Sequence, residues 1–324
     1  MAGRILVTGA TGFLGGAILR RLGADGIGQG RNAKSIANLK RNKLHAISWS
    51  LPDPAPVDQI ADDITAIVHC AGLSAPFGAR QAFYDANVAG TRTVLDFARN
   101  RGIRRVVFIS SPSVYFSLSD QLNVTEDMIL PPPFTAYAAS KIAAERLVMA
   151  APELGSIILR PRGIYGPDDA SLLPRLLEAA KARALPRFRG GRARIDLTYI
   201  DDVVDAVMAA LRAGPAAECK QFNISGGEVI PIREIVESAC AQAGIIPRWR
   251  AMPLTPALAM ARAAEAVALM RARPQEPKVT RYVLGLFAFE QSLDISRARR
   301  ELGWAPQVSF ADGLERSFAD RSPI

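Results

Sequence analysis

The chain contains few of the residues that build metal centres and disulfide frameworks. It has two histidines, His45 and His69, and three cysteines, Cys70, Cys219 and Cys240, in 324 residues. An odd number of cysteines without metal-ligand spacing argues against a zinc site and against a disulfide-stabilised fold. We therefore expect neither a metal nor a disulfide framework.

Long apolar runs and leader-like segments are also missing. The most hydrophobic late segment, residues 252–270, contains Arg262 and Glu265 and falls short of the roughly 20 uninterrupted apolar residues that a membrane span needs. We expect it to form a buried or surface-lying helix. The start of the chain, MAGRILVTGA, leads into a strand pattern without a basic region followed by an apolar signal-peptide core. These features predict a cytoplasmic protein.

The composition is that of an ordinary folded protein, with 49% hydrophobic and 22% charged residues. A chain of 324 residues is longer than most single-core domains, which predicts one large α/β domain with a smaller C-terminal addition. The net charge of +9 suits an anionic partner such as a phosphorylated cofactor, a carrier protein or a lipid surface. Scattered arginines would give the same charge without forming a patch. We do not expect a nucleic-acid partner.

Short β-branched runs alternate with helical patterns through the first half of the chain. Because parallel neighbours need a crossover element, this alternation predicts right-handed βαβ units in a doubly wound, Rossmann-type parallel sheet. The runs RRVVFIS and ITAIVHC are almost entirely apolar, which is typical of central strands covered on both faces. The predicted strands are 4–8, 45–48, 66–70, 105–110 and 156–159, and the predicted helices begin at Phe13 and span about 83–100.

A glycine cluster, TGATGFLGG, lies between the first strand and the first helix. Its members Gly9, Gly12 and Gly15 are spaced GxxGxxG. Gly9 allows a tight turn, Gly12 lets the backbone approach a pyrophosphate, and Gly15 lets the helix pack closely on the strand. The N-terminus of the helix then faces the negative charge. In this βαβ context the cluster predicts a dinucleotide-binding turn.

The end of the second strand determines which dinucleotide is favoured. A binder of NAD usually has an acidic residue there, whereas an arginine suits the 2′-phosphate of NADP. The stretch GIGQGRNAK has no carboxylate but contains Arg31 and Lys34. It favours NADP(H) over NAD(H). The alternative is that both are ordinary solvated residues at the start of the next helix.

After about residue 165 the alternation becomes less regular. The expected elements are a basic loop (PRFRGGRAR), a helix from Asp201, a short strand (QFNIS), a helix from Ile232 and an Ala-rich segment near residue 260. We predict that residues 1–165 form an NAD(P)-binding Rossmann domain. Residues 166–324 are expected to form mainly a substrate-binding lobe, interleaved with late returns to the sheet. A long loop, residues 111–137, is expected to border the site.

Tyr137 and Lys141 lie one helical turn apart in YAASK, and therefore on one face of a helix. A lysine ammonium held beside a phenol favours the phenolate, so Tyr137 is a candidate general acid or base. The serines of FISSPSVY follow a central strand, and ligands bind outside the carboxyl ends of such strands. We therefore expect these serines near the pair.

Together these motifs resemble those of the extended short-chain dehydrogenase/reductase superfamily, which is similar to the NAD-dependent epimerases and dehydratases. The resemblance covers nearly the whole chain. It is carried by TGATGFLGG, NVAGTRTVLDFARNRGIRRVVFISSPSVY, YAASK, LRPRGIYGP, LTYIDDVVDAV and LDISRARRELGWAP. It implies that the Ser111 hydroxyl hydrogen-bonds the reacting oxygen, that Tyr137 exchanges a proton with it, and that Lys141 also binds the nicotinamide ribose. Ser113 is either a secondary contact or part of a capped turn.

The resemblance also implies cofactor contacts outside the glycine triplet. Thr11, Phe13 and Leu14 are expected at the phosphates, Ala71 and Gly72 on the adenosine side, and Pro161 and Ile164 over the nicotinamide. One position departs from the family pattern. Where the family often has an aspartate near the adenine, SWSLPD has Ser50, so the adenine contact is assigned to the main chain of Leu51.

The resemblance extends to one branch of the superfamily. Nucleotide-sugar epimerases and dehydratases usually carry an arginine before their D-x-x-Y segment, but here Ile195 takes that place and Arg194 lies one residue away. In a strand, a shift of one residue turns the side chain to the other face. The segments RIDLTYIDD and TRYVLGLFAFEQSLDISRARRELGWAP are more similar to 3β-hydroxysteroid dehydrogenases, sterol-carboxylate dehydrogenases and 2-alkyl-3-oxoalkanoate reductases.

This branch implies an NADP(H)-dependent oxidoreductase that interconverts a ketone and a secondary alcohol on a bulky apolar substrate, either steroid-like or long-chain 3-oxoacyl-like. The alternative is a nucleotide-sugar epimerase or dehydratase with tightly bound NAD. Residues 252–270 are open to three interpretations: a lid over the substrate, a peripheral membrane contact, or packing that includes homodimer contact. Four arginines, Arg187, Arg189, Arg192 and Arg194, would suit a carrier phosphopantetheine or coenzyme A, but we interpret them as a solvated loop.

Overall fold

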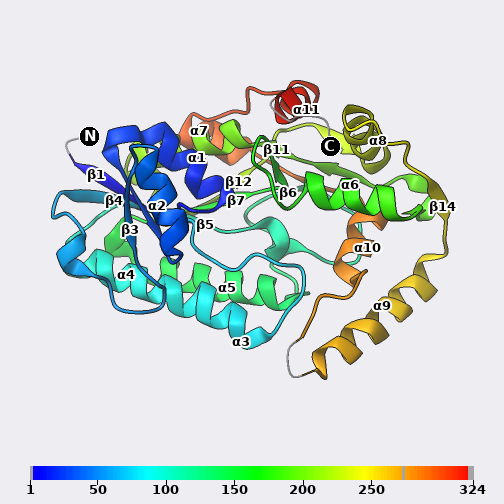
Figure 1. Cartoon of the computed structure of the whole chain (residues 1–324), viewed down its shortest axis with the longest axis horizontal. Helices are drawn as coiled ribbons and strands as arrows, with labels where there is room; N and C mark the ends of the chain where they lie inside the picture. Colours follow the sequence, from blue (N-terminus) through cyan, green and yellow to red (C-terminus); the bar gives the residue numbers. More distant parts are fainter. Residues whose placement is uncertain (1–2, 272–273, 320–324) are drawn as a thin grey trace.

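A seven-stranded parallel sheet forms the centre of the molecule (Figure 1). The structure is a computed structural model that describes residues 3–271 and 274–319. The strand order is β12-β7-β5-β4-β1-β2-β3, and every neighbouring pair is parallel. This is the predicted doubly wound arrangement. The strands are β1 (Arg4–Thr8), β2 (Gly26–Gly30), β3 (His45–Ser48), β4 (Ile64–His69), β5 (Val106–Ile109), β7 (Ile157–Pro161) and β12 (Lys220–Ile224).

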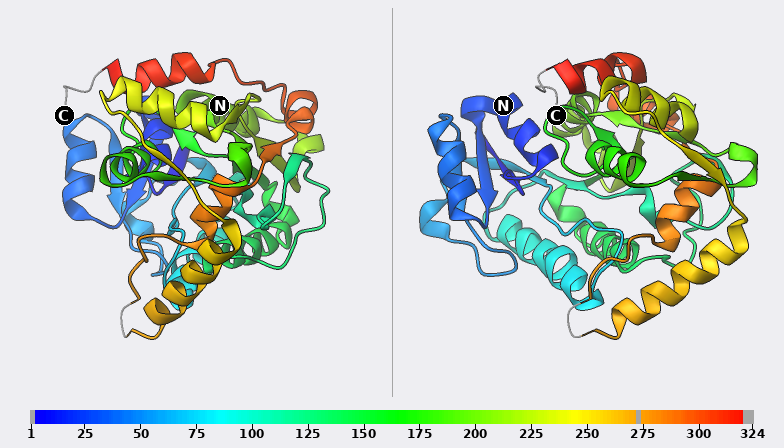
Figure 2. Two further views of the ribbon diagram at one scale, coloured as in Figure 1. Left: turned by 90° about the vertical axis from the view of Figure 1, so that its right-hand side faces the viewer. Right: turned by 45° about the vertical axis from the view of Figure 1, so that its right-hand side comes forward.

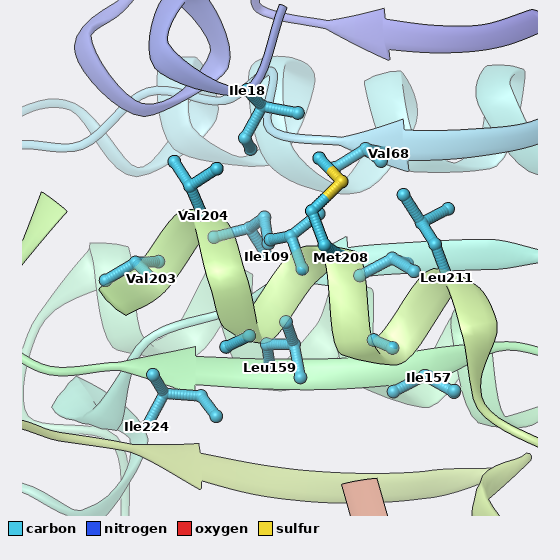
Figure 3. Packing of buried hydrophobic residues seen from close by; sticks show 14 of the residues in the cluster. Ile18, Val68, Ile109, Ile157, Leu159, Val203, Val204, Met208, Leu211 and Ile224 are labelled. Carbon is cyan, nitrogen blue, oxygen red and sulfur yellow. The ribbon is translucent and has the colours of Figure 1, made fainter. Parts of the chain in front are cut away.

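Helices α1 (Phe13–Leu22) and α7 (Ile200–Arg212) cover one face of this sheet, with α2 (Ala33–Arg41) beside β3. Figure 3 shows Val204 and Met208 of α7 in one cluster with Ile18, Val68 and Leu159. Val68 and Leu159 are fully buried in the central strands β4 and β7. The dense packing fixes where the carboxyl ends of these strands lie.

Helices α4 (Gly90–Asn100) and α5 (Ala136–Met149) cover the opposite face. The helix predicted over about 83–100 is interrupted, because α3 (Arg80–Phe83) runs into a π-helical segment, Tyr84–Ala89, before α4 begins. This segment contains Asn87, whose side chain exchanges two hydrogen bonds with the main chain of Leu73. A π-helical segment has no signature in apolar periodicity, so the sequence did not reveal it.

A second sheet has the order β13-β10-β15-β6 and brings together strands from distant parts of the chain. The prediction of a loop over 111–137 is partly wrong, because this segment contains β6. β6 is short and mainly exposed, and its partner β15 lies about half the chain away, so local sequence carried little signal for it. The remaining strands are β6 (Gln121–Val124), β10 (Arg194–Asp196), β13 (Val229–Pro231), β15 (Gln291–Leu293), the pair β8 (Ile164–Tyr165) and β11 (Thr198–Tyr199), and the pair β9 (Leu185–Arg187) and β14 (Trp249–Ala251).

The remaining α-helices in the described part of the chain are α6 (Leu173–Ala182), α8 (Ile232–Gln242), α9 (Leu254–Leu269), α10 (Arg281–Ala288) and α11 (Phe310–Ala319), and α8 packs against β13 of the second sheet. Figure 2 shows α9 running along the outside of the molecule, next to α10. Among the described residues of α9 only Ala261 and Ala268 are buried, so of the two predicted alternatives, a buried or a surface-lying helix, the structure has the surface-lying one. Within the described ranges, no helix is both long and apolar enough to cross a membrane.

In the basic segment near residue 190, Arg187, Arg192 and Arg194 are exposed, as predicted for a solvated loop, but the segment includes the ends of β9 and β10 and is held by ion pairs. Arg189 forms a bidentate ion pair with Asp120, with nitrogen–oxygen distances of 2.6 and 2.7 Å, and Arg192 bonds the same carboxylate at 2.9 Å. Arg194 pairs with Glu290. These arginines therefore anchor the segment to the second sheet.

Candidate active site

One cavity of about 1180 Å³ opens at the carboxyl ends of the central strands. It is lined by the glycine turn, by the start of α5 and by the loops that follow β4, β5 and β7. Further walls come from α6, α9 and α10 and from strands β9, β10 and β15. The predicted site residues in its lining are Gly9, Gly12, Phe13, Leu14, Gly15, Gly72, Ser111, Tyr137, Lys141, Pro161 and Ile164.

The glycine turn has the backbone geometry that a dinucleotide requires. Gly9 has a φ of 68°, and a β-carbon at position 15 would lie 2.4 Å from the Gly9 carbonyl oxygen. Gly12 begins α1 without a side-chain cap from the described residues, so peptide N–H groups at this helix end remain available. Since helix N-termini bind phosphates through such groups, the turn fits a pyrophosphate.

Gln29 supports this turn and was missed in the sequence. Its side-chain oxygen accepts a hydrogen bond from Gly9 N at 2.9 Å, and its main-chain oxygen accepts one from Ala10 N. Its amide nitrogen donates to the main chain of Trp49. A buried glutamine in a glycine-rich strand was the available signal, because a buried amide needs partners.

Five predicted cofactor residues lie outside the cavity lining: Thr11, Arg31, Lys34, Leu51 and Ala71. Arg31 directly follows β2, and Lys34 lies in the first turn of α2. Both side chains are exposed, and neither forms an ion pair with another described residue. Thr11 packs against Gly30, Leu51 packs against Gly90, and Ala71 N donates to the Thr8 hydroxyl.

Tyr137 and Lys141 project from one face of α5. Thr135 caps this helix by accepting a hydrogen bond from Ala138 N. The Tyr137 ring packs against Phe83, with ring centroids 6.1 Å apart. Lys141 is only 6% exposed, and its Nζ donates to the Ile109 main-chain oxygen at 2.8 Å. One turn of helix therefore joins a cavity-facing phenol to a buried ammonium.

Ser111 lies where β5 ends and a single 3₁₀ turn, Pro112–Tyr115, begins. Its hydroxyl oxygen accepts a hydrogen bond from Ser113 N at 3.2 Å, which leaves the hydroxyl proton available to a ligand. The Ser113 hydroxyl has no partner among the described residues. Ser113 N therefore contributes to a capped turn, one of the two roles considered for this residue.

A buried ion pair fastens α5 to the sheet. Glu145, one turn after Lys141, accepts bidentate hydrogen bonds from Arg160 at 2.8 and 2.6 Å. Glu145 also accepts from the hydroxyl of Ser110, the neighbour of Ser111. Arg160 continues the network by donating to Tyr115. A bidentate buried pair of this kind fixes geometry, and it was not predicted because its partners come from three separate elements.

His69 is buried near Lys141, and both side chains contact the ring of Phe108. The Thr91 hydroxyl donates its proton to Asn87 O, so in its contact with His69 Nε2 at 3.0 Å it must be the acceptor. His69 Nε2 therefore carries the ring proton, and Nδ1 accepts a hydrogen bond from the Thr8 hydroxyl at 2.7 Å. Burial, together with the charge of the Lys141 ammonium, lowers the pKa of His69 to about 3. The histidine is therefore uncharged at neutral pH.

Cys70 lines the cavity next to this histidine. Burial raises the pKa of its thiol to about 12, although the Lys141 ammonium acts in the opposite direction. Since the thiolate is the reactive form, Cys70 is a poor nucleophile. The chemistry of the cavity is therefore left to its hydroxyl groups and its lysine.

Residues 5–225 match the NAD dependent epimerase/dehydratase family. The chain belongs to this family. It is 34% identical to a 2-alkyl-3-oxoalkanoate reductase of Stenotrophomonas maltophilia, over 97% of this chain and 98% of the relative. It is 30% identical to a 4-hydroxy-2-methyl-3-oxo-4-farnesyl-3,4-dihydroquinoline-1-oxide ketoreductase of Stigmatella aurantiaca, over 96% and 95% of the two chains.

Among solved structures, a dTDP-glucose 4,6-dehydratase of Streptomyces venezuelae with NAD bound superimposes with a TM-score of 0.75. The two chains are 26% identical, with 98% of this chain and 96% of the other covered. Family and relatives together make the chain an NAD(P)-dependent oxidoreductase of the extended short-chain type, as the sequence motifs indicated.

Replacing Gly15 by alanine should block the glycine turn. The new β-carbon would lie 2.4 Å from a backbone oxygen, which is closer than real contacts allow. We expect the Kd for the dinucleotide to rise at least about tenfold, as measured by calorimetry. Gly214→Ala is the control, because a β-carbon at that position meets nothing within 4 Å. Unchanged affinity in Gly15→Ala would contradict the role of this turn.

The His69 site should make stability depend on pH. Because the folded-state pKa of about 3 lies below the ordinary 6.5, the unfolded chain takes up the proton first as the pH falls. The contribution of the neutral histidine to the free energy of unfolding is complete above pH 6.5. It is lost as the pH falls toward 3, by at most about 1.4 kcal/mol per pH unit. Urea unfolding at a series of pH values should give a shallower loss for His69→Gln, whereas His45→Gln should keep the wild-type slope. Equal slopes in both variants would count against a neutral buried histidine.

Proposed function

We propose that this enzyme uses NADP(H) to interconvert a ketone and a secondary alcohol on a bulky apolar substrate, with long-chain 3-oxoalkanoates as the leading class. The observation that carries the proposal is the continuity of one cavity. It holds the glycine turn, the Ser111, Tyr137 and Lys141 side chains and a large apolar wall. That wall includes Leu176, Ala179, Met260, Ala261, Leu286 and Phe287.

The three polar side chains suit carbonyl reduction. When bound, the reduced nicotinamide supplies the hydride. Tyr137 donates a proton to the carbonyl oxygen, and the free Ser111 hydroxyl proton holds the same oxygen by a hydrogen bond. The Lys141 ammonium donates one of its three N–H groups to Ile109 O. Its other two N–H groups remain for the Tyr137 oxygen and the nicotinamide ribose. In the oxidative direction the same proton returns to Tyr137.

The apolar wall favours this function over nucleotide-sugar chemistry. At the position where nucleotide-sugar enzymes usually have an arginine, Ile195 lines the cavity, while Arg194 pairs with Glu290 at the surface. The arginine that these enzymes use to hold a sugar diphosphate is therefore replaced by a side chain without charge at this position. The relatives named as ketoreductases support the same choice.

Helix α9 is proposed as part of the substrate wall. Four of its residues, Ala257, Met260, Ala261 and Ala264, line the cavity. Three of these are alanines, which leaves room for an apolar chain between α9 and α10. This supports the lid interpretation of residues 252–270, while homodimer and membrane contact remain hypotheses for the outer face of this helix.

Tyr137→Phe should abolish turnover while leaving cofactor binding intact. Removing the hydroxyl deletes the proton donor, which is worth about 10²–10⁴-fold in kcat, but it leaves the ring packed on Phe83. The measurement is NADPH oxidation at its absorbance band with a panel of ketones, together with the NADPH Kd, expected within a few-fold of wild type. Tyr84→Phe, at an exposed tyrosine, is the matched control. Near-normal rates in Tyr137→Phe would show that the proton comes from elsewhere.

Arg31→Ala should reduce the preference for NADPH. Loss of a charge-assisted hydrogen bond to a 2′-phosphate is worth about 1.5–3 kcal/mol, or roughly 10- to 100-fold in KM for NADPH. KM for NADH should change little, because NADH has no phosphate at this position. Arg41→Ala, at the other end of α2, serves as the control. If wild type turns over with NADH as well as with NADPH, and Arg31→Ala changes neither KM, the NADP proposal is wrong.

A further inference from the structure

A buried arginine lies in the wall of this cavity, beside the proposed catalytic residues. Arg162 follows β7 and is 8% exposed. Its Nε lies 2.9 Å from Asp196 Oδ1 in an ion pair that lacks hydrogen-bond geometry, and its Nη2 donates to the side-chain oxygen of Gln291 at 2.6 Å. Its Nη1 makes no hydrogen bond with any residue in the ranges the structure describes. Arg162 therefore presents an unused donor where it lines the cavity.

The partners of Arg162 are held so firmly that the guanidinium cannot easily turn away. Asp196 is 1% exposed and accepts from the Ser225 hydroxyl at 2.6 Å and from Leu293 N at 2.9 Å. Gln291 is 4% exposed, and its amide oxygen is engaged by Arg162. These contacts come from β10 and β15, so two strands orient the guanidinium.

Gln291 supplies a second unused donor. Since its oxygen is engaged by Arg162, its Nε2 is the amide nitrogen, and this atom has no partner among the described residues. Gln291 also lines the cavity. Leaving a buried amide donor unpaired costs about 1–3 kcal/mol, which a ligand oxygen would recover.

Tyr282 of α10 connects this corner of the cavity to Tyr137. Its ring packs on Phe116, with centroids 4.6 Å apart. Burial raises the pKa of Tyr282, while the charge of Arg162 lowers it and Tyr137 raises it. Tyr282 therefore lies within electrostatic reach of both residues. Arg162 and Ser111 both line the cavity and follow the ends of two paired strands, because Ile109 of β5 lies opposite Leu159 of β7, so an oxygen near Arg162 would be close to the reacting carbonyl.

We propose that Arg162 Nη1 and Gln291 Nε2 bind the carboxylate of the 3-oxoalkanoate, so that the enzyme selects oxo acids over ketones of equal chain length. The proposal rests on the proposed function, because it takes the carbonyl oxygen to lie at Tyr137 and Ser111. In a 3-oxo acid one carbon separates the carbonyl from the carboxyl group, so both must bind in one corner of the cavity. A wall meant only for apolar chains would gain nothing from donors left without a partner, because an unpaired buried donor is costly.

The test compares a 2-alkyl-3-hydroxyalkanoate with its methyl ester, two stable substrates for the oxidative direction with NADP⁺. Wild type should favour the acid by at least about 30-fold in kcat/KM, since an unpaired polar site rejects the uncharged analogue. Arg162→Gln should lower kcat/KM for the acid to within a few-fold of the ester, mainly through KM, and change the ester little. If Arg162→Gln fails to fold, Gln291→Leu should lower the acid preference in the same direction, because it removes the other proposed donor.

Arg175→Gln is the matched control, because Arg175 is an exposed arginine in the lining of the same cavity and pairs with Glu276. It should leave the acid preference unchanged. Equal losses for acid and ester in Arg162→Gln would mean that Arg162 is only structural. Loss of the acid preference in Arg175→Gln instead would place the carboxylate near Arg175. Either result overturns the proposal.

A binding measurement separates this proposal from the proposed function. Calorimetry with a 2-alkylalkanoate, which has the carboxylate but no carbonyl, needs no turnover. Wild type should bind the acid more tightly than its methyl ester, and Arg162→Gln should bind both equally. If wild type oxidises neither substrate but keeps this Arg162-dependent binding, the proposed reaction fails and the carboxylate site stands. If acid and ester bind wild type equally, the site fails.

Discussion

The contact between Lys141 and the end of β5 is the interaction on which the site depends. Its ammonium donates to Ile109 O at 2.8 Å and lies 4.9 Å from the centroid of the Phe108 ring. Because Lys141 belongs to α5 and Ile109 to β5, the contact sets the position of the helix that carries Tyr137 relative to the strand that leads to Ser111. The pair of Glu145 with Arg160 fastens the same helix one turn later.

The proposed cofactor site and the apolar wall lie on either side of this contact between α5 and β5. Toward the N-terminal half lie the glycine turn and the start of α1, where we propose that the dinucleotide binds, and Gln29 bonds the turn at Gly9 N. Toward the C-terminal half, α6, α9 and α10 supply an apolar wall. The strand β12 returns to the main sheet beside β7, so both halves share one core. A hydride donor and an apolar acceptor can therefore meet at the same three side chains.

The sequence predicted those features of the fold and the site that depend on residues close together in the chain. The central strands are buried on both faces, so their apolar runs were visible, and the spacing of Tyr137 and Lys141 follows directly from helix geometry. Partners distant in the chain were not predictable. Arg162 and Gln291 are 129 residues apart, and β6 pairs with a strand from the far end of the chain. The sequence does not show that an arginine such as Arg162 is buried or which residue it pairs with, because both depend on strands that come together only in the folded protein.

The most direct test of this account is a structure of the enzyme with NADP⁺ and a secondary alcohol bound. We predict that the alcohol oxygen lies within hydrogen-bond distance of both the Tyr137 and Ser111 hydroxyls, with its carbinol carbon facing nicotinamide C4 and its chain against α9 and α10. An alcohol bound away from these hydroxyls, or a dinucleotide bound away from the glycine turn, would contradict the account.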